Sequence, residues 1–215
     1  MTTPTVLEKI IAEKRKHIAA QRVDRRVDPK ALQRTSSVRG FSDALKAKQA
    51  LGLPAVIAEI KKGSPSKGVI RPNFDVASIA ASYERHGAAC LSCLTDEPFF
   101  FGCDADLATA RSSAALPVLR KDFIIDEFQI IEAKAYGASV ILLIASCLTP
   151  ATTQLLAAKA KALGLEVLLE LHDETELEHI CNEVDLVGIN NRSLKSFEVN
   201  IEHSLELKNK LPKEK

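Results

Sequence analysis

The sequence predicts an α/β protein of the (β/α)8 TIM-barrel class, and the chain supplies about six of the eight βα units of such a barrel. First, short apolar runs alternate with helical stretches. Second, these runs are almost continuous Val, Ile and Leu, which is typical of parallel strands covered on both faces. Third, each run ends in polar residues. The strand ends of a closed barrel converge on one mouth, whereas a doubly wound sheet uses only its switch point, so the barrel is favoured.

The composition is that of an ordinary globular protein. The chain has 215 residues, 46% hydrophobic and 27% charged, with a net charge of +1 and no Trp. Such a charge balance lacks the basic footprint of a protein whose main partner is nucleic acid. No apolar run approaches the roughly 18 to 20 residues of a membrane span, and the N-terminus lacks the apolar core of a secretory signal. We therefore expect a cytoplasmic protein that does not span a membrane.

Two helices are expected before the first strand. Over Val6–Ala20, apolar residues recur near helical spacing with Glu and Lys between them. The second helix is expected over Phe41–Gln49, with Ser42 as a candidate cap, and Gly52 and Pro54 follow it. The sequence thus predicts a single domain over residues 1–215, with residues 1–52 as an N-terminal helical extension. A closed barrel needs eight strands and this chain offers six, so either the barrel is incomplete or the fold is not a closed barrel.

The βα units follow in order along the chain. The apolar runs predict strands at Ala55–Ile60, Cys90–Thr95, Pro117–Phe123, Val140–Ala145, Glu166–Leu171 and Leu186–Asn190. Helical patterns follow these runs at Val76–His86, Ala105–Ser113, Asp126–Tyr136, Pro150–Leu163, Thr175–Cys181 and Ile201–Lys210.

The five cysteines are scattered and odd in number, which suits a reducing compartment better than a disulfide framework. Cys90 and Cys93 have the spacing of half a metal or redox site. No second pair completes a zinc site, and in a strand these two positions point to opposite faces. We therefore expect them to be core residues.

The densest group of polar residues follows the first predicted strand. Glu59 and Lys61 are two residues apart and therefore share a face, where a carboxylate can hold an ammonium group. Ser64 and the backbone amides near Gly63 could receive a phosphate. The alternative is a solvated turn with a surface ion pair. A Walker A loop is excluded, because Gly68 is not followed by Lys and Ser or Thr.

Two further strand ends carry groups suited to proton transfer. Lys121 stands in a run that otherwise favours apolar residues, so we expect it to be partly desolvated and usable as a general acid. Its alternative is a lysine that extends from the strand end to solvent. Glu170 follows an apolar run and should either pair with a cation or keep a proton. His172 could share its face, and is unlike a metal ligand because no other His stands at ligand spacing.

The last strand end and one aromatic run complete the candidates. Asn190 ends an apolar run and is expected to hydrogen-bond a substrate or a polar network, and Arg192 could contact an anion. The run Phe99–Phe101 either covers an apolar substrate ring or packs under its loop.

Taken together, the strand-end motifs resemble those of the indole-3-glycerol phosphate synthase family. The motifs are AEIKKGSPSKG, SCLTDEPFFFG, LRKDFIID, LLELHDE and VGINNRSL. Their order and spacing match too, and the resemblance covers essentially the whole chain. It implies a ribulose-phosphate-binding TIM barrel with an N-terminal extension. The implied reaction closes the ring of 1-(2-carboxyphenylamino)-1-deoxyribulose 5-phosphate and releases carbon dioxide and water, without a metal or organic cofactor.

The resemblance also implies residue roles. Lys121 resembles the general acid that protonates the substrate ketone during ring closure. Lys61 would meet the substrate carboxylate and donate a proton in the later dehydration, with Glu59 as its partner and a candidate base. Glu170 resembles the family's other essential carboxylate, which stabilises positive charge on the ring nitrogen or relays protons. The division of acid and base steps among these four residues stays open.

The implied binding residues hold the rest of the substrate. Asn190 and Arg192 would place the ribulose-derived chain, Ser64 would help receive the phosphate, and Phe100 would line the anthranilate pocket. The implied partner is therefore a small phosphorylated molecule, and a monomer or weak oligomer is expected for the complete protein.

The sequence departs from the family pattern at its end. The family continues with a seventh strand carrying Glu-Ser-Gly and an eighth with a glycine-containing phosphate loop, and neither motif is present. We therefore expect this chain alone to be inactive or nearly so, and unstable through its open sheet edges. Two alternatives remain: a related barrel such as phosphoribosylanthranilate isomerase, which gives no reason for the Lys121 motif, and a non-catalytic fragment completed by a partner chain.

Overall fold

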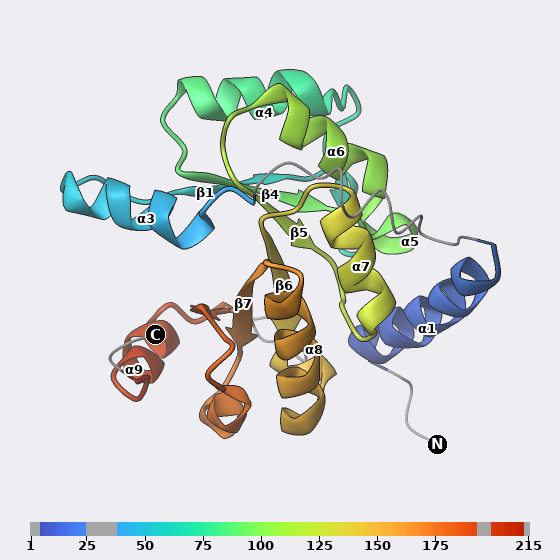
Figure 1. The fold of residues 1–215 in the computed structure, drawn as a ribbon, viewed down its shortest axis with the longest axis vertical. Helices are drawn as coiled ribbons and strands as arrows, with labels where there is room; N and C mark the ends of the chain where they lie inside the picture. The colour runs from blue at the N-terminus through green and yellow to red at the C-terminus, as the bar shows by residue number, and fades with distance from the viewer. Residues whose placement is uncertain (1–4, 25–37, 193–198, 213–215) are drawn as a thin grey trace.

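The centre of the fold is a parallel sheet of six strands that curls into a half-barrel (Figure 1). The structure, a computed structural model, describes residues 5–24, 38–192 and 199–212. Each strand pairs in parallel with the next strand of the sheet, in the order β1-β4-β5-β6-β7-β8. The strands are β1 (Ile57–Ile60), β4 (Cys90–Leu94), β5 (Val118–Lys121), β6 (Val140–Ile144), β7 (Glu166–Leu171) and β8 (Leu186–Ile189). All six predicted strands are confirmed.

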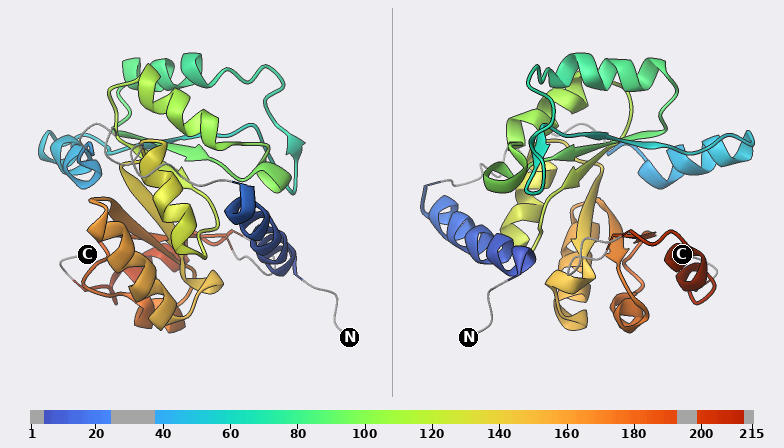
Figure 2. Two further views of the ribbon diagram at one scale, coloured as in Figure 1. Left: turned by 45° about the vertical axis from the view of Figure 1, so that its right-hand side comes forward. Right: turned by 180° about the vertical axis from the view of Figure 1, so that it is seen from behind.

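A helix follows each strand and packs on the outer face of the sheet (Figures 1 and 2). The helices are α4 (Val76–Arg85), α6 (Asp104–Ser113), α7 (Glu127–Ala135), α8 (Pro150–Ala162), the 3-10 helix η2 (Glu174–His179) and α9 (Glu202–Lys208). The prediction of an α-helix over Thr175–Cys181 was wrong in type. Asp173 caps Thr175 there and the Glu176 carboxylate accepts the His172 N–H, so local side-chain bonds favour the tighter, shorter turn.

Several short elements between the strands have no signature in the sequence pattern. An antiparallel hairpin of β2 (Gly63–Ser64) and β3 (Gly68–Val69) follows β1. The helix α5 (Glu97–Phe100) follows β4, and the 3-10 helix η1 (Ala145–Cys147) follows β6. Elements of two to four residues are too short to show a hydrophobic period, so only the folded chain reveals them.

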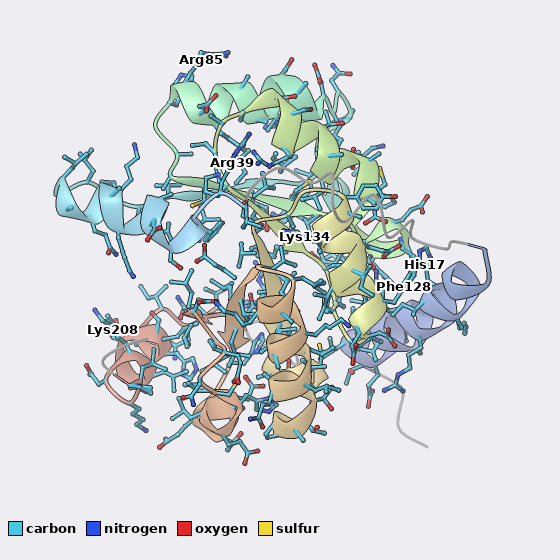
Figure 3. All side chains as sticks on the ribbon, viewed as in Figure 1. His17, Arg39, Arg85, Phe128, Lys134 and Lys208 are labelled. Atoms are coloured by element: carbon cyan, nitrogen blue, oxygen red, sulfur yellow. The ribbon has the colours of Figure 1, made fainter. Side chains whose placement is uncertain are left out.

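The two helices before the sheet lie at its opposite ends (Figures 1 and 2). The helix α1 (Val6–Asp24) lies at the carboxyl ends of the strands, and α3 (Phe41–Ala50) lies at their amino ends. Arg39, labelled in Figure 3, donates to the carbonyl oxygens of Ala114 and Leu116 at 2.6 and 2.8 Å, just before β5. This places the start of α3 at the amino ends.

The group that caps the N-terminus of α3 comes from a distant part of the chain. The prediction that Ser42 caps this helix was wrong. The N-cap is Gly40, which offers no side chain. Instead, the Glu166 carboxylate at the start of β7 accepts the N–H groups of Phe41 and Ser42 at 2.6 and 2.9 Å. A carboxylate at a helix N-terminus satisfies free N–H groups and interacts well with the helix dipole.

Apolar side chains lie on both faces of the sheet. On the outer face, Cys93 and Leu91 belong to the cluster that packs under the helices. On the inner face, Cys90 packs with Phe41 and Leu142 at the end closed by α3. Cys90 and Cys93 therefore point to opposite faces, as the strand pattern predicts.

Across the described residues, β1 and β8 are the outer strands of the sheet, so these residues form an open half-barrel. Val56, just before β1, leaves 49% of its surface exposed, and every position of β8 is only partly buried. Within the same ranges, no helix has the length and apolar character needed to cross a membrane.

Candidate active site

A cavity of about 400 Å³ opens at the carboxyl ends of the strands. All eight residues predicted for the site line it: Glu59, Lys61, Ser64, Phe100, Lys121, Glu170, Asn190 and Arg192. They come from β1, the β2-β3 hairpin, α5, β5, β7 and the end of β8. The convergence follows from the fold, because parallel strands in a curled sheet bring their carboxyl ends to one mouth.

One carboxylate at this mouth binds two lysines. Lys121 Nζ lies 2.5 Å from Glu59 Oε2, and Lys61 binds the other oxygen, Oε1. The three side chains are between 26 and 36% exposed, so solvent reaches them only in part. Burial alone would raise the pKa of Glu59, but the charges and hydrogen bonds of Lys121 and Lys61 outweigh it and lower the pKa. Glu59 is therefore a stable anion that holds two ammonium groups.

The hairpin after β1 places Ser64 over the cavity. Gly63 is buried in it, and a Cβ atom there would meet the Gly68 carbonyl oxygen at 2.4 Å and the Phe101 ring at 2.6 Å. The close approach of the two backbone segments therefore requires glycine. Among the residues that the structure describes, the Ser64 hydroxyl has only a 3.5 Å contact, with the Ser66 hydroxyl, which leaves it available to a ligand.

A second carboxylate faces the cavity from β7. Glu170 Oε1 accepts a hydrogen bond of 3.0 Å from the Asn190 side-chain amide, across the pairing of β7 with β8. The Asn190 side-chain oxygen in turn accepts the N–H of Arg192 at 3.0 Å, which orders the start of the following loop. Asn190 thus positions Glu170, and it joins two of the predicted site residues in one network.

His172 stands beside Glu170 and is sandwiched between carboxylates. Its Nε2 lies 3.5 Å from Glu170 Oε1 and its Nδ1 lies 3.4 Å from Glu176 Oε2. Burial alone would lower the pKa of His172, but the close contact with the Glu176 carboxylate and the charges of Glu170, Glu176 and Asp173 outweigh it and raise the pKa. The partner that the structure places beside Glu170 is therefore a histidine whose pKa is raised.

One side of the cavity is apolar. Phe100 and Phe123 form a tilted pair with ring centroids 6.1 Å apart, and Val6, Leu7 and Ile10 of α1 add aliphatic surface. Phe101 instead adopts the left-handed conformation, with φ at 60°, and is 41% exposed. Two roles were expected for the phenylalanine run, covering a substrate ring or packing under its loop. Phe100 fits the first role, since it lines the cavity.

A buried ionic network at the ends of β4 and β5 was not among the predicted site residues. Lys14 of α1 binds Asp96 and Asp122 at 2.7 and 2.8 Å, at the ends of β4 and β5. Arg120 lies 3.4 Å from Asp122 and donates to the Gln129 carbonyl oxygen at 2.7 Å. A signal for Lys14 existed in the sequence, because it lies four residues from both Ile10 and Ile18, on the apolar face of its helix.

Chemically, the cavity combines proton carriers with an apolar wall. Two ammonium groups share one carboxylate on one side, and a second carboxylate with an amide stands on the other. Such a pair of groups can donate a proton at one atom of a ligand and accept one at another. The aromatic wall suits an apolar ring.

The profile of the family described as indole-3-glycerol phosphate synthase matches residues 7–215 of this chain. The chain belongs to this family.

Two relatives carry the same name. The indole-3-glycerol phosphate synthase of Neisseria gonorrhoeae is 52% identical over 205 residues, which cover 94% of this chain and 79% of the relative. That of Leptothrix cholodnii is 51% identical over 214 residues, covering 98% and 81%. The family assignment confirms the synthase and carboxy-lyase activity of tryptophan biosynthesis that the resemblance implies, and it removes the support for the isomerase alternative.

A solved structure supports the fold. Tryptophan synthase subunit alpha from Legionella pneumophila matches with a TM-score of 0.55 at 14% identity, over 79% of this chain and 73% of that one. At this identity the likeness concerns the fold alone, and it agrees with a TIM-type arrangement of strands and helices.

Proposed function

We propose that the cavity at the carboxyl ends of the strands is the site where 1-(2-carboxyphenylamino)-1-deoxyribulose 5-phosphate is converted to indole-3-glycerol phosphate. One observation carries the proposal: Lys121 and Lys61 share the Glu59 carboxylate, and Glu170 with Asn190 lines the same cavity. Ring closure and dehydration each need a proton donor at the C2 oxygen of the substrate, first as a carbonyl and then as a hydroxyl group, and this arrangement supplies two donors.

The first step is ring closure. Lys121 donates a proton to the C2 carbonyl oxygen of the ribulose-derived chain, which makes C2 electrophilic toward the aromatic carbon that bears the carboxylate. A carbon–carbon bond forms, the ring loses its aromaticity, and positive charge develops on the ring nitrogen. The Glu170 carboxylate stabilises that charge, and Asn190 holds Glu170 in place.

The second and third steps restore aromaticity. Carbon dioxide leaves with its bonding electrons returned to the ring. Lys61 then protonates the hydroxyl group formed from the carbonyl oxygen, which leaves as water while C1 loses a proton to Glu59 or Glu170. The products are one molecule each of indole-3-glycerol phosphate, carbon dioxide and water. Glu59 holds both lysine side chains in place between turnovers.

The remaining residues hold the substrate. Phe100 lies against the anthranilate ring, Asn190 and Arg192 place the hydroxylated chain, and Ser64 with the hairpin amides receives the phosphate. These roles are supported by the position of all these residues in the lining of one cavity.

The cellular location, oligomeric state and partners of the protein belong to the same proposal. The near-neutral net charge of +1 and membership of a biosynthetic family support a cytoplasmic enzyme, monomeric or weakly oligomeric, that binds no nucleic acid. The single barrel domain over residues 1–215, with residues 1–52 as its extension, is proposed in the same way. Cell fractionation and light scattering test the location and the oligomeric state.

The direct test uses the whole protein that the gene encodes. Incubation with the substrate should produce indole-3-glycerol phosphate, measured by its indole fluorescence, and carbon dioxide in equal molar amounts. A folded protein that releases neither from this substrate would contradict the proposed function. Carbon dioxide without indole fluorescence would contradict the proposal that dehydration is completed at the same site.

A further inference from the structure

We propose that Lys14 is a positioning residue of this active site: its ammonium group fixes α1 and the Phe100–Phe123 wall in the arrangement that receives the anthranilate ring. The inference deepens the proposed function and rests on it, because it concerns the same cavity. Lys14 does not line this cavity but a second, polar one, so it acts on the active site through other residues.

The position of Lys14 on its helix is unusual for a lysine. Ile10, Lys14 and Ile18 are four residues apart and therefore share one face of α1. All three are buried, with exposed fractions of 4, 6 and 5%. A buried ammonium group is costly unless it is paired and hydrogen-bonded, so this lysine must have partners on the surface that α1 covers.

Its partners are two carboxylates at neighbouring strand ends. Lys14 Nζ lies 2.7 Å from Asp96 Oδ1 and 2.8 Å from Asp122 Oδ1, and both aspartates are buried. Burial alone would lower the pKa of Lys14, but the charges of Asp122 and Asp96 outweigh it and raise the pKa. One charged side chain therefore joins α1 to the ends of β4 and β5.

The same aspartates fix the backbone beside the two aromatic rings. Asp96 accepts the N–H of Phe99 at 3.0 Å through Oδ2 and so caps α5, which carries Phe100. Asp122 accepts the N–H of Phe123 at 2.8 Å through Oδ1, the oxygen that Lys14 also binds. Lys14 therefore orients the groups that hold each ring, and the rings meet at the cavity.

The other oxygen of Asp122 already has partners. Its Oδ2 accepts the Thr95 hydroxyl at 2.9 Å and lies 3.4 Å from Arg120. Arg120 and Thr95 keep Asp122 in the core without α1, whereas Lys14 is its link to the helix. Loss of the Lys14 charge should therefore release α1 and the aromatic wall while the strands stay folded.

The helix itself takes part in the cavity. Figure 2 shows α1 lying along the carboxyl ends of the strands, and Figure 3 labels His17 on α1 and Phe128 on α7, the helix that it contacts. One turn before Lys14, Ile10 lines the cavity together with Val6 and Leu7. Anchoring at Lys14 thus sets how closely these aliphatic side chains approach a bound ring.

The kinetic test compares Lys14→Met with Lys16→Met in the whole protein that the gene encodes. Lys16 is on the same helix, but its side chain is 74% exposed and pairs with Glu13 at the surface. For Lys14→Met we expect KM for the substrate to rise about tenfold or more while kcat stays within about threefold, because the wall contacts the ring and not the reacting atoms. Lys16→Met should change neither, and Lys14→Arg should recover most of the affinity.

A second measurement is independent of activity. Amide hydrogen exchange should become faster in α1 and in residues 97–101 of Lys14→Met, with no change in the core strands, and should be unchanged in Lys16→Met. If Lys14→Met does not fold, Lys14→Met combined with Asp96→Asn removes the excess buried negative charge and should show the same rise in KM.

The outcomes separate the two proposals. An unchanged KM, a fall in kcat alone, or unchanged exchange in α1 overturns the role of Lys14. A wild-type protein that makes no product overturns the proposed function and with it the substrate half of this inference. The exchange measurement then still decides whether Lys14 anchors α1.

Discussion

Glu59 and Lys121 meet across the mouth of the sheet, with Lys121 Nζ 2.5 Å from Glu59 Oε2, although β4 lies between their strands. The curl of the sheet permits this contact, because side chains on the inner face of a curled sheet converge. The pair, with Lys61 on the other carboxylate oxygen, is the chemical centre of the proposed mechanism.

Replacing Lys121 by Met should remove the general acid of ring closure. We expect kcat to fall by about 10² to 10⁴, the usual range for a positioned proton donor. The melting temperature should fall only slightly, because the lost ion pair with Glu59 stands at the rim, where the Lys121 side chain is about one-third exposed. Indole fluorescence and thermal unfolding measure the two quantities.

The control for this variant is Lys46→Met, which removes an exposed lysine from α3 at the opposite end of the sheet. It should leave both kcat and the melting temperature unchanged. Turnover by Lys121→Met at close to the wild-type rate would show that another group protonates the ketone.

The ion pairs of Glu59 predict a pH dependence of stability. Its pKa in the folded protein is lower than the ordinary value of 4.5. The stability that ionised Glu59 contributes is therefore fully present above about pH 4.5 and is lost as the pH falls through the lowered folded pKa. The difference in melting temperature between wild type and Glu59→Gln should follow this course.

A matched control is Glu127→Gln, whose carboxylate pairs with Lys159 at the surface. Solvent weakens such exposed pairs, so this variant should show little difference from wild type at any pH. A Glu59→Gln difference that grows toward acid pH would contradict the predicted sign.

His172 predicts the opposite dependence. Its pKa is raised above the ordinary value of 6.5, because the carboxylates around it outweigh its burial. The stability gained from the protonated ring is therefore fully present below pH 6.5 and is lost as the pH rises through the raised folded pKa. Denaturant unfolding of wild type and His172→Gln at several pH values measures this difference.

The ring itself can be followed by nuclear magnetic resonance, in which the His172 signals should titrate above pH 6.5. His86→Gln, which removes an exposed histidine after α4, serves as the comparison for the unfolding curves. A midpoint for His172 below the ordinary value would show that burial, and not the surrounding charge, controls this side chain.

Glu166 should matter for stability and not for catalysis. Replacing it by Ala removes the acceptor of the Phe41 and Ser42 N–H groups at the start of α3. Loss of such a cap costs about 1 to 3 kcal/mol of unfolding free energy. The free energy of unfolding should fall by this amount, while kcat/KM stays unchanged because α3 lies at the amino ends of the strands.

Here the comparison is with Glu206→Ala, an exposed glutamate on α9, which should have no measurable effect on stability. A loss of kcat/KM in folded Glu166→Ala protein would show that the two ends of the sheet are coupled.

Much of the site could be predicted from the sequence because the end of each parallel strand is marked by a change from apolar to polar residues. In Val118–Lys121 and Leu186–Ile189, an apolar run ends at a polar residue or just before one, and that change marks where a chain enters the mouth of a barrel. The order of the strands needed no further information, since each βα unit places the next strand beside the last. The eight predicted residues therefore lie around one cavity.

The sequence by itself thus determined the strand order, the helices that separate the strands, and which side chains reach the carboxyl ends. Only the tertiary structure decided which distant residues touch: that Glu59, expected to pair with Lys61, also binds Lys121, that Glu166 caps α3, and that Lys14 joins two aspartates. The physical reason is the range of the interactions. The periodicity of apolar residues reflects local secondary structure and burial. An ion pair between distant segments instead depends on how the whole sheet curls and where each helix packs.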